Sequence, residues 1–269
     1  MDSMIELSPI QVALAGLLVL AIGALSVACQ LGMHKTLLGA AMRMAAQLLL
    51  VGLVLEWVFR VDRWYVVVAI VVAMTGIAGV TAGRRAHRRY AGIWINAIVS
   101  IWASSWLIGG FGLVIVVRGQ HPWYEPQYAI PLMGMVLGNS LNGIALGLNT
   151  FLDGVIARRQ QVEARLALGA TRWEAAREPI RHAVRMGMIP IVNAMMVAGV
   201  VSLPGVMTGQ LLSGVAPIEA VKYQIVILSL VASATALGTF GVVVLSFLRF
   251  FSRDHQFLHQ RLSPDRTHG

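Results

Sequence analysis

The chain has little charge, few lysines and a single cysteine, and each shortage excludes a class of protein. Charged residues make up 12% of its 269 residues, whereas soluble domains carry about 25%. Cys29 is the single cysteine, so the chain is not a disulfide scaffold. The two lysines, Lys35 and Lys222, do not follow glycine, so the Gly-Lys pair of a phosphate-binding P-loop is missing. We therefore expect no ATP hydrolysis by this chain.

Histidine and carboxylates are missing from the middle of the apolar runs. The seven histidines fall at the ends of these runs, in loops or near the C-terminus. An intramembrane enzyme would need a catalytic group such as histidine at membrane depth, and a secondary transporter would normally use a carboxylate relay. A tight transition-metal cage also draws on these side chains. The sequence therefore predicts no catalytic residues, no cofactor bound by this chain and no confidently assigned metal ligands.

Apolar residues are abundant instead, at 57% of the chain with a mean hydropathy of +0.73. They occur in blocks of about 20 residues, the length that crosses a bilayer core. We predict an all-α membrane protein with seven transmembrane helices, over 10–31, 36–59, 64–83, 91–117, 127–151, 184–212 and 220–248. These form one transmembrane domain over 1–248, followed by a cytoplasmic tail over 249–269. The first residues lack a signal-peptide pattern, so we expect no removable signal.

The basic residues are distributed unevenly between alternate loops, and the net charge is +9. One set of loops holds Lys35, the arginines at 84, 85, 88 and 89, those at 158, 159, 165, 172, 177, 181 and 185, and those from 249 onward. The other set holds Arg60, Arg63, Arg118 and Lys222. Basic loops stay in the cytoplasm, which predicts an outside N-terminus and a cytoplasmic C-terminus. Because these charges flank apolar blocks, they indicate contact with membrane lipid and no nucleic-acid partner.

The cytoplasmic segment over 153–185 predicts a projecting elbow of two helices. Gly169 is placed to stop the first helix. Thr171 and Glu174 form a capping box that starts the second, which Pro179 is expected to kink or end. Such an elbow fits a groove on a soluble partner, or lies flat on anionic lipid. The residues alone favour neither interpretation.

Sequence motifs resemble those of a transporter family. The run Glu163-Ala164-Arg165 followed by Gly169 is similar to the EAA-x-x-x-G signature of ABC-transporter permeases, extended by the run 168–171. The segments 130–139, 200–210 and 216–225 resemble the FetB-type permease family, described as iron exporters with plant relatives linked to aluminium tolerance. The likeness extends from Arg43 to Gln224, nearly the whole chain.

The resemblance implies a half-transporter in a bacterial cytoplasmic (inner) membrane. Two copies of the chain would form the pathway, and two copies of a separate ABC ATPase would hold ATP and Mg²⁺. The elbow would be the coupling helix that contacts the ATPase, through Glu163, Ala164, Arg165, Leu168, Gly169, Ala170, Thr171 and Glu174. We therefore expect a permease subunit that exports a metal ion, with iron as the favoured candidate, or a metal complex. The alternatives are a non-metal ABC exporter, a mechanotransmitting ABC scaffold and, less favoured, an ATP-independent secondary transporter.

Polar and small residues inside the spans are the candidates for a pathway or a hinge. They are Arg43, Gln47, Gly138, Asn139, Asn142, Asn193, Ser202, Pro204 and Gly205. A polar side chain is costly to bury in hydrocarbon, and glycine or proline disrupts a helix. We therefore expect each of these residues to pack against a partner, to reach the membrane–water interface or to line the translocation path. Pro204 and Gly205 predict a hinge or re-entrant element over 202–209. Met133, Met195 and Met207 are weak candidates for soft-metal ligands, and adaptable core residues otherwise.

Overall fold

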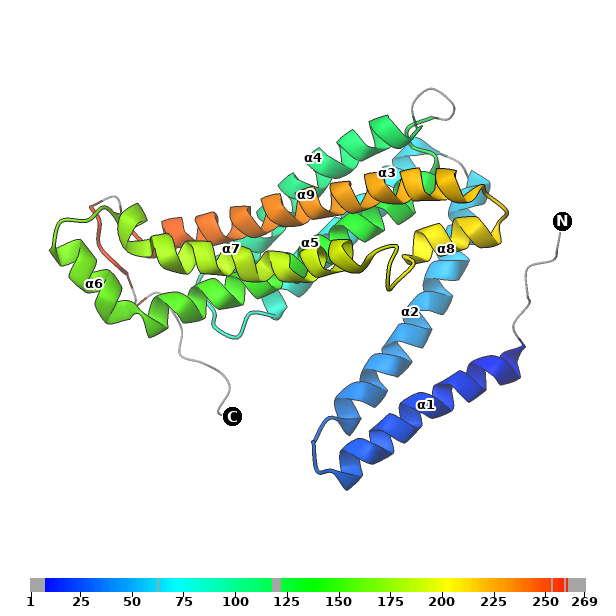
Figure 1. The fold of residues 1–269 in the computed structure, drawn as a ribbon, viewed down its shortest axis with the longest axis horizontal. Coiled ribbons are helices and arrows are strands. Elements are labelled where there is room, and N and C mark those ends of the chain that lie inside the picture. The colour runs from blue at the N-terminus through cyan, green and yellow to red at the C-terminus, as the bar shows by residue number, and fades with distance from the viewer. Residues whose placement is uncertain (1–7, 62, 118–121, 253, 259, 261–269) are drawn as a thin grey trace. The chain divides into compact units, whose positions relative to one another are not determined.

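All regular structure in the described part of the chain is helical (Figure 1). The computed structural model describes residues 8–61, 63–117, 122–252, 254–258 and 260. Their helices are α1 (Pro9–Ala28), α2 (His34–Val61), α3 (Trp64–Arg84), α4 (Ile93–Val117), α5 (Pro126–Ala157), α6 (Arg159–Ala167), α7 (Arg172–Val197), α8 (Gly205–Leu212) and α9 (Pro217–Phe250). They fall into two compact units, 1–62 and 63–269.

The first unit is a hairpin of α1 and α2. Ser8 and Gln11 form a capping box at the start of α1. The turn between the helices needs two positive φ angles, at Gln30 and Gly32, and the Ser26 hydroxyl accepts a hydrogen bond from the Met33 N–H at 3.1 Å. On α2, Glu56 and Arg60 form the ion pair expected from their spacing of four residues. Most apolar side chains of this hairpin are exposed, as is usual where lipid or other protein covers a helix.

The second unit is a bundle in which α5, α7 and α9 pack against one another (Figure 1). The helix α4 packs on α5 and α9, and α3 packs on α4 and α5. The bundle core contains Ile144, Leu148 and Phe151 of α5 together with Phe247 and Phe250 of α9, all of them buried. Because α5 contacts four other long helices, it is the central helix of the unit.

Glycines allow α5, α7 and α9 to approach closely at one level. A Cβ on Gly187 would lie 2.7 Å from the carbonyl oxygen of Gly143, and 2.5 Å from Thr239 Cγ2. A Cβ on Gly147 would lie 2.6 Å from the same Thr239 methyl. Small residues serve this purpose in membrane helices, where close packing supplies much of the attraction between them. This contact fixes how the three helices cross.

Six described helices are long and apolar enough to cross a membrane: α1, α2, α3, α4, α5 and α9. The expected span over 184–212 does not form one helix, so a seventh continuous span is not confirmed. The helix α7 ends at Val197, and α8 begins only at Gly205. Gly199 adopts a φ of +81° and donates to the Ser202 carbonyl at 2.9 Å, which turns the chain out of the helix. The break thus covers 198–204, earlier than the predicted 202–209.

Pro179 neither ends the second elbow helix nor separates it from the membrane segment. Of the two expected effects of Pro179, a kink or an end of the helix, the end does not occur, because α7 continues through Pro179 and Pro190 to Val197. Pro179 is buried, with its Cβ within 4.0 Å of the position a Cβ on Gly154 would take. Packing against α5 compensates for the helix hydrogen bond that proline cannot make. One helix therefore connects the elbow to the break at 198–204.

Candidate functional site

The elbow between α6 and α7 forms at the turn that the sequence predicts. Gly169 has a φ of +91°, a conformation that favours glycine. Its N–H donates to the Leu166 carbonyl and the Ala170 N–H to the Arg165 carbonyl, both at 3.0 Å. These two bonds are those of a Schellman motif, the common glycine-based helix end. The backbone of the turn is therefore fully specified by local sequence.

The second elbow helix starts with the predicted capping box. The Glu174 N–H donates to Thr171 Oγ1 at 3.3 Å, and the Thr171 N–H donates to Glu174 Oε2 at 2.7 Å. The hydrogen bonds from the Thr171 hydroxyl and N–H lower the pKa of the Glu174 carboxyl, and nearby His255 adds to this effect. The carboxylate form thus holds the start of α7 in place.

The tip of the elbow is exposed while its base is buried. Leu168 at the tip is 88% exposed. Ala164, Arg165 and Glu174 are exposed too, and Glu163 accepts a hydrogen bond from Arg159 at 2.7 Å. Val162, Ala175 and Ala176 lie below them in the bundle core. A rigidly seated elbow therefore presents the predicted coupling residues at one end of the bundle (Figure 1).

The chain after α9 folds back onto the elbow, a feature that sequence reasoning missed. The Phe251–Phe257 bridge and a 2.8 Å bond from the Leu258 N–H to the Phe250 carbonyl close a hook, whose described residues are 251, 252 and 254–258. Arg172 Nη1 donates to the Phe251 and Ser252 carbonyls at 3.4 and 3.2 Å. The predicted tail over 249–269 thus begins with a packed segment. Residues 253, 259 and 261–269 lie outside the described part.

Ring contacts add to this attachment. The rings of Trp173 and Phe247 lie 4.2 Å apart, and the Arg172 guanidinium lies 5.9 Å from the centre of the Phe247 ring. The Arg172 N–H donates to His255 Nδ1 at 3.0 Å. The start of α7 is therefore tied to the end of α9 through both backbone and side chains. The phenylalanines at 250, 251 and 257 in an otherwise polar tail were the available signal in the sequence.

The α5 asparagines mostly bind within the chain. Asn142 Oδ1 accepts from Arg85 Nη1 at 2.7 Å. Asn149 accepts from the His87 N–H at 2.9 Å and donates to the Arg85 carbonyl at 3.0 Å. Asn139 donates to the Met135 carbonyl of its own helix at 2.9 Å. Asn142 and Asn149 therefore anchor the loop between α3 and α4, while Gly138 and Asn139 remain on an exposed face of α5.

The remaining pathway candidates are not brought together with these asparagines by any hydrogen bond among the described residues. Arg43 and Gln47 are both exposed on α2, in the first unit. Asn193 is exposed on α7, and Ser202, Pro204 and Gly205 lie at the break or just after it. The structure thus shows two groups in the second unit, one on α5 and one at the break, with Arg43 and Gln47 in a separate unit.

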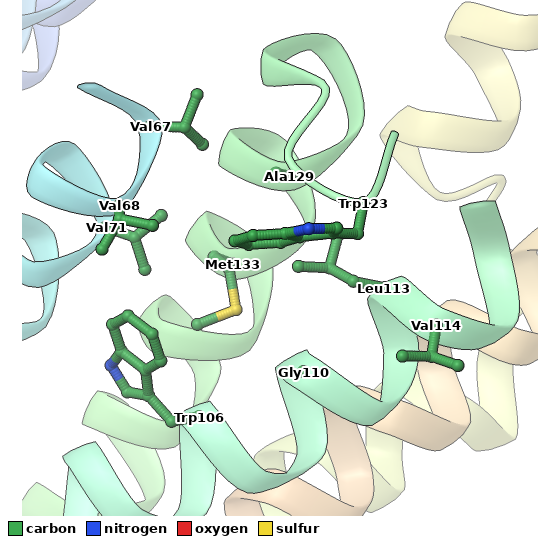
Figure 2. A pocket seen from close by; sticks show the side chains of 10 residues that line it. All are labelled: Val67, Val68, Val71, Trp106, Gly110, Leu113, Val114, Trp123, Ala129 and Met133. Atoms are coloured by element: carbon green, nitrogen blue, oxygen red, sulfur yellow. The ribbon is translucent and has the colours of Figure 1, made fainter. Parts of the chain in front are cut away.

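The three methionine candidates have different surroundings. Met133 is buried in an apolar cavity of about 270 Å³ between α3, α4 and α5, beside Trp106 and Trp123 (Figure 2). Its sulfur is the sole thioether among the ten residues that line this cavity, and no carboxylate or imidazole is among them. Met195 is 44% exposed on α7, and Met207 is half-buried on α8. In the described part of the chain, no group of three or more His, Cys, Asp or Glu side chains can hold a metal ion.

Basic residues gather at the elbow end of the second unit. The Arg88 guanidinium pairs with Asp153 at 2.9 Å, at the end of α5 that leads into α6. A Cβ on Gly92 would lie 3.3 Å from Arg249 Nη2, which places the end of α9 against the loop between α3 and α4. Three loops that are far apart in the sequence therefore meet at one end of the bundle.

Long apolar helices with these basic loops define a multi-pass integral membrane protein. The chain belongs to the family described as "Uncharacterised protein family (UPF0014)", which matches residues 9–251. It is 36% identical to "UPF0014 membrane protein slr1647" of Synechocystis sp., over 85% of this chain and 88% of that protein.

Two further relatives carry names that concern metals. The chain is 30% identical to "Probable iron export permease protein FetB" of Escherichia coli K12, over 87% of this chain and 88% of that one. It is 27% identical to "Protein ALUMINUM SENSITIVE 3" of Arabidopsis thaliana, over 90% and 86%. These relatives confirm the resemblance inferred from the motifs. No solved structure matches this chain.

Proposed function

We propose that the chain is the membrane permease subunit of an ABC transporter that exports a metal ion, iron first among the candidates, or a metal complex. Two copies would form the pathway in the bacterial cytoplasmic membrane, with the N-terminus outside and the elbow and C-terminus in the cytoplasm. Two copies of a separate ATPase would supply energy from ATP and Mg²⁺. The broken segment of α7 and α8 would be the seventh membrane element.

The observation that carries this proposal is the exposed elbow on a rigid base. A soluble partner needs a small, fixed protrusion that fits a groove, and Leu168 offers an apolar anchor for it. The capping box and the Schellman turn hold that anchor in one geometry. A helix lying flat on lipid has no need of such a defined tip.

The continuity of α7 suggests how force would reach the membrane. Its 26 residues span about 39 Å at 1.5 Å per residue. A displacement of the elbow would therefore be transmitted along α7 to the break at 198–204 with little decrease in its size. This break and Gly138 on α5 are where we expect the two helices to tilt between cytoplasm-open and outside-open states.

Iron as substrate is supported by the name of the Escherichia coli relative and by the chemistry of the break. The carbonyls of residues 198–201 accept no backbone hydrogen bond in the described part of the chain. Free carbonyls and amides bind hard cations weakly, which suits an ion that must leave again. Arg43, Gln47, Asn139 and Asn193 are the side chains that we expect along the path.

The test is ATPase activity of the chain purified together with an ABC ATPase, in lipid nanodiscs. Fe²⁺, Fe³⁺, Al³⁺, Cu⁺ and a metal-free sample are compared. We expect one metal to stimulate hydrolysis, and Gly169→Val to abolish the stimulation while leaving the chain inserted. Gly214→Val is the matched control, because Gly214 also has a positive φ, +83°, and a Cβ at either position meets no atom within 4 Å.

Each outcome assigns a function. Equal loss of stimulation in both variants would show that backbone strain alone is responsible, and would count against the elbow as the coupling element. Binding of the ATPase without stimulation by any metal would favour a non-metal exporter or a mechanotransmitting scaffold. Failure of any ABC ATPase to bind would overturn the proposal and favour an ATP-independent secondary transporter.

A further inference from the structure

A cationic cavity of about 200 Å³ lies where the end of α5 meets α7. It is lined by Arg158, Glu178, Arg181, His182 and Arg185. We propose that this cavity binds the phosphate of an anionic phospholipid, with the acyl chains lying along α7. This inference does not depend on the transport function proposed above.

The cavity has an excess of positive charge that the protein does not neutralise. Three guanidinium groups and one imidazole face a single carboxylate, that of Glu178. None of the three arginines forms an ion pair in the described part of the chain, whereas Arg88 and Arg159 are paired with Asp153 and Glu163. Arginine binds phosphate oxygens through parallel N–H bonds, so unpaired arginines around one cavity suit a phosphate group.

The two helices that build the cavity fix its geometry. Glu178, His182 and Arg185 recur at spacings of four and three residues and so share one face of α7. Arg158 is the cap residue between the end of α5 and the start of α6, and it lines the same cavity as this face. A basic pocket between membrane helices is the usual setting for an anionic headgroup.

The cavity lies where charge gives way to apolar sequence along α7. Arg185 is the last charged residue before an uncharged stretch that extends to residue 218. The same face continues past Arg185 with Ile189, Val192 and Met196, which are 39%, 41% and 73% exposed. A cationic site followed by an exposed apolar stripe matches an amphiphile with an anionic head and a hydrocarbon tail. Free phosphate would use the first part of this surface and leave the second unoccupied.

The test is native mass spectrometry of the full chain released from detergent micelles that contain phosphatidylglycerol or phosphatidylcholine. We expect phosphatidylglycerol to bind preferentially, and Arg181→Gln with Arg185→Gln to weaken binding about 25-fold, at roughly fivefold per arginine. Arg165→Gln with Arg177→Gln is the matched control, since it removes the same charge from elbow residues outside this cavity. Glu178→Gln should tighten binding, because it removes the one negative charge.

Several results would overturn the proposal. Equal weakening by the control pair would mean that the attraction comes from overall charge and not from this cavity. No preference for phosphatidylglycerol over phosphatidylcholine, or no tightening by Glu178→Gln, would also exclude it. Displacement of the lipid by low millimolar inorganic phosphate would show that the site serves free phosphate, which contradicts the lipid assignment.

Discussion

The close approach of α5 to α9 predicts that a single added methyl group at Gly147 destabilises the bundle. A Cβ at this position would lie 2.6 Å from Thr239 Cγ2, well inside van der Waals contact, while the next atoms are the Ala183 carbonyl oxygen at 3.4 Å and Val243 Cγ2 at 3.7 Å. One side-chain methyl therefore accounts for the clash. Overpacking costs about 1–3 kcal/mol. Replacing a glycine within a helix by alanine stabilises the folded state by about 0.5–1 kcal/mol, which offsets part of this cost.

The net effect of Gly147→Ala is a loss of about 1–2 kcal/mol in the free energy of unfolding. For a chain of this size, that lowers the apparent melting temperature by a few degrees. The assay is thermal unfolding in detergent, followed by tryptophan fluorescence. Gly138→Ala on the same helix is the control, since a Cβ there meets no atom within 4 Å. We expect its melting temperature to stay equal or rise.

A double mutant identifies the contact responsible. Thr239→Ser removes the methyl group that the new Cβ would meet, so Gly147→Ala should cost less in that background than in the wild type. We expect a coupling energy of about 1 kcal/mol, typical of residues in direct contact. A melting temperature for Gly147→Ala at or above that of the wild type, or strictly additive effects in the double mutant, would refute the close packing of α5 on α9.

Three further predictions concern the elbow end of the bundle. Arg172→Ala should release the hook that follows α9, because the Arg172 guanidinium holds the Phe251 and Ser252 carbonyls, and amide hydrogen exchange at Leu258 should accelerate. Arg177→Ala is the control, and equal exchange in both variants would contradict the attachment. Hydrogen bonds from Thr171 lower the pKa of Glu174. The cap therefore stabilises α7 fully at pH values above the ordinary pKa of a carboxyl group, and this stabilisation is lost as the pH falls through the lowered pKa. The protection factor for amide exchange in the first turn of α7, which is the intrinsic rate at each pH divided by the observed rate, should therefore fall at acid pH, and a pH-independent protection factor there would be inconsistent with the cap. Asn149→Ala should cost about 0.5–1.5 kcal/mol, because it removes the bonds to the His87 N–H and the Arg85 carbonyl, which are exposed and can be partly replaced by water. Asn139→Ala, which affects a bond within α5, should cost less in the same melting assay, and a larger loss for Asn139→Ala would contradict this interpretation.

Features set by neighbouring residues could be predicted from the sequence. The stop at Gly169 and the capping box of Thr171 and Glu174 depend on bonds across three or five residues, and both form as expected. The ends of most long helices agree to within a few residues for the same reason, since hydropathy is a local property. The sequence predicts a break in the helix near Pro204, and the structure has one, but it begins earlier in the chain because the chain turns at Gly199, which has a positive φ.

Features that depend on distant residues could not be predicted. The hook joins Arg172 to residues about 80 positions away, and the Asn149 bonds join residues more than 60 positions apart. The continuation of α7 through Pro179 depends on packing against α5, which outweighs the local tendency of proline to end a helix. Local pattern alone did not assign Asn142 a partner, and the structure pairs it with Arg85.

Local sequence patterns alone therefore establish a multi-pass helical membrane protein with basic loops and a capped elbow, because hydropathy, charge and helix-end chemistry depend on residues a few positions apart. The tertiary structure decided which polar groups anchor loops and which remain exposed, since each of those choices depends on what the fold places opposite them. It also brought Arg158 beside Arg181 and Arg185, and joined the end of α9 to the start of α7. Burial and hydrogen bonding are properties of neighbours in space, and the helix crossings at Gly143, Gly147 and Gly187 set which neighbours those are.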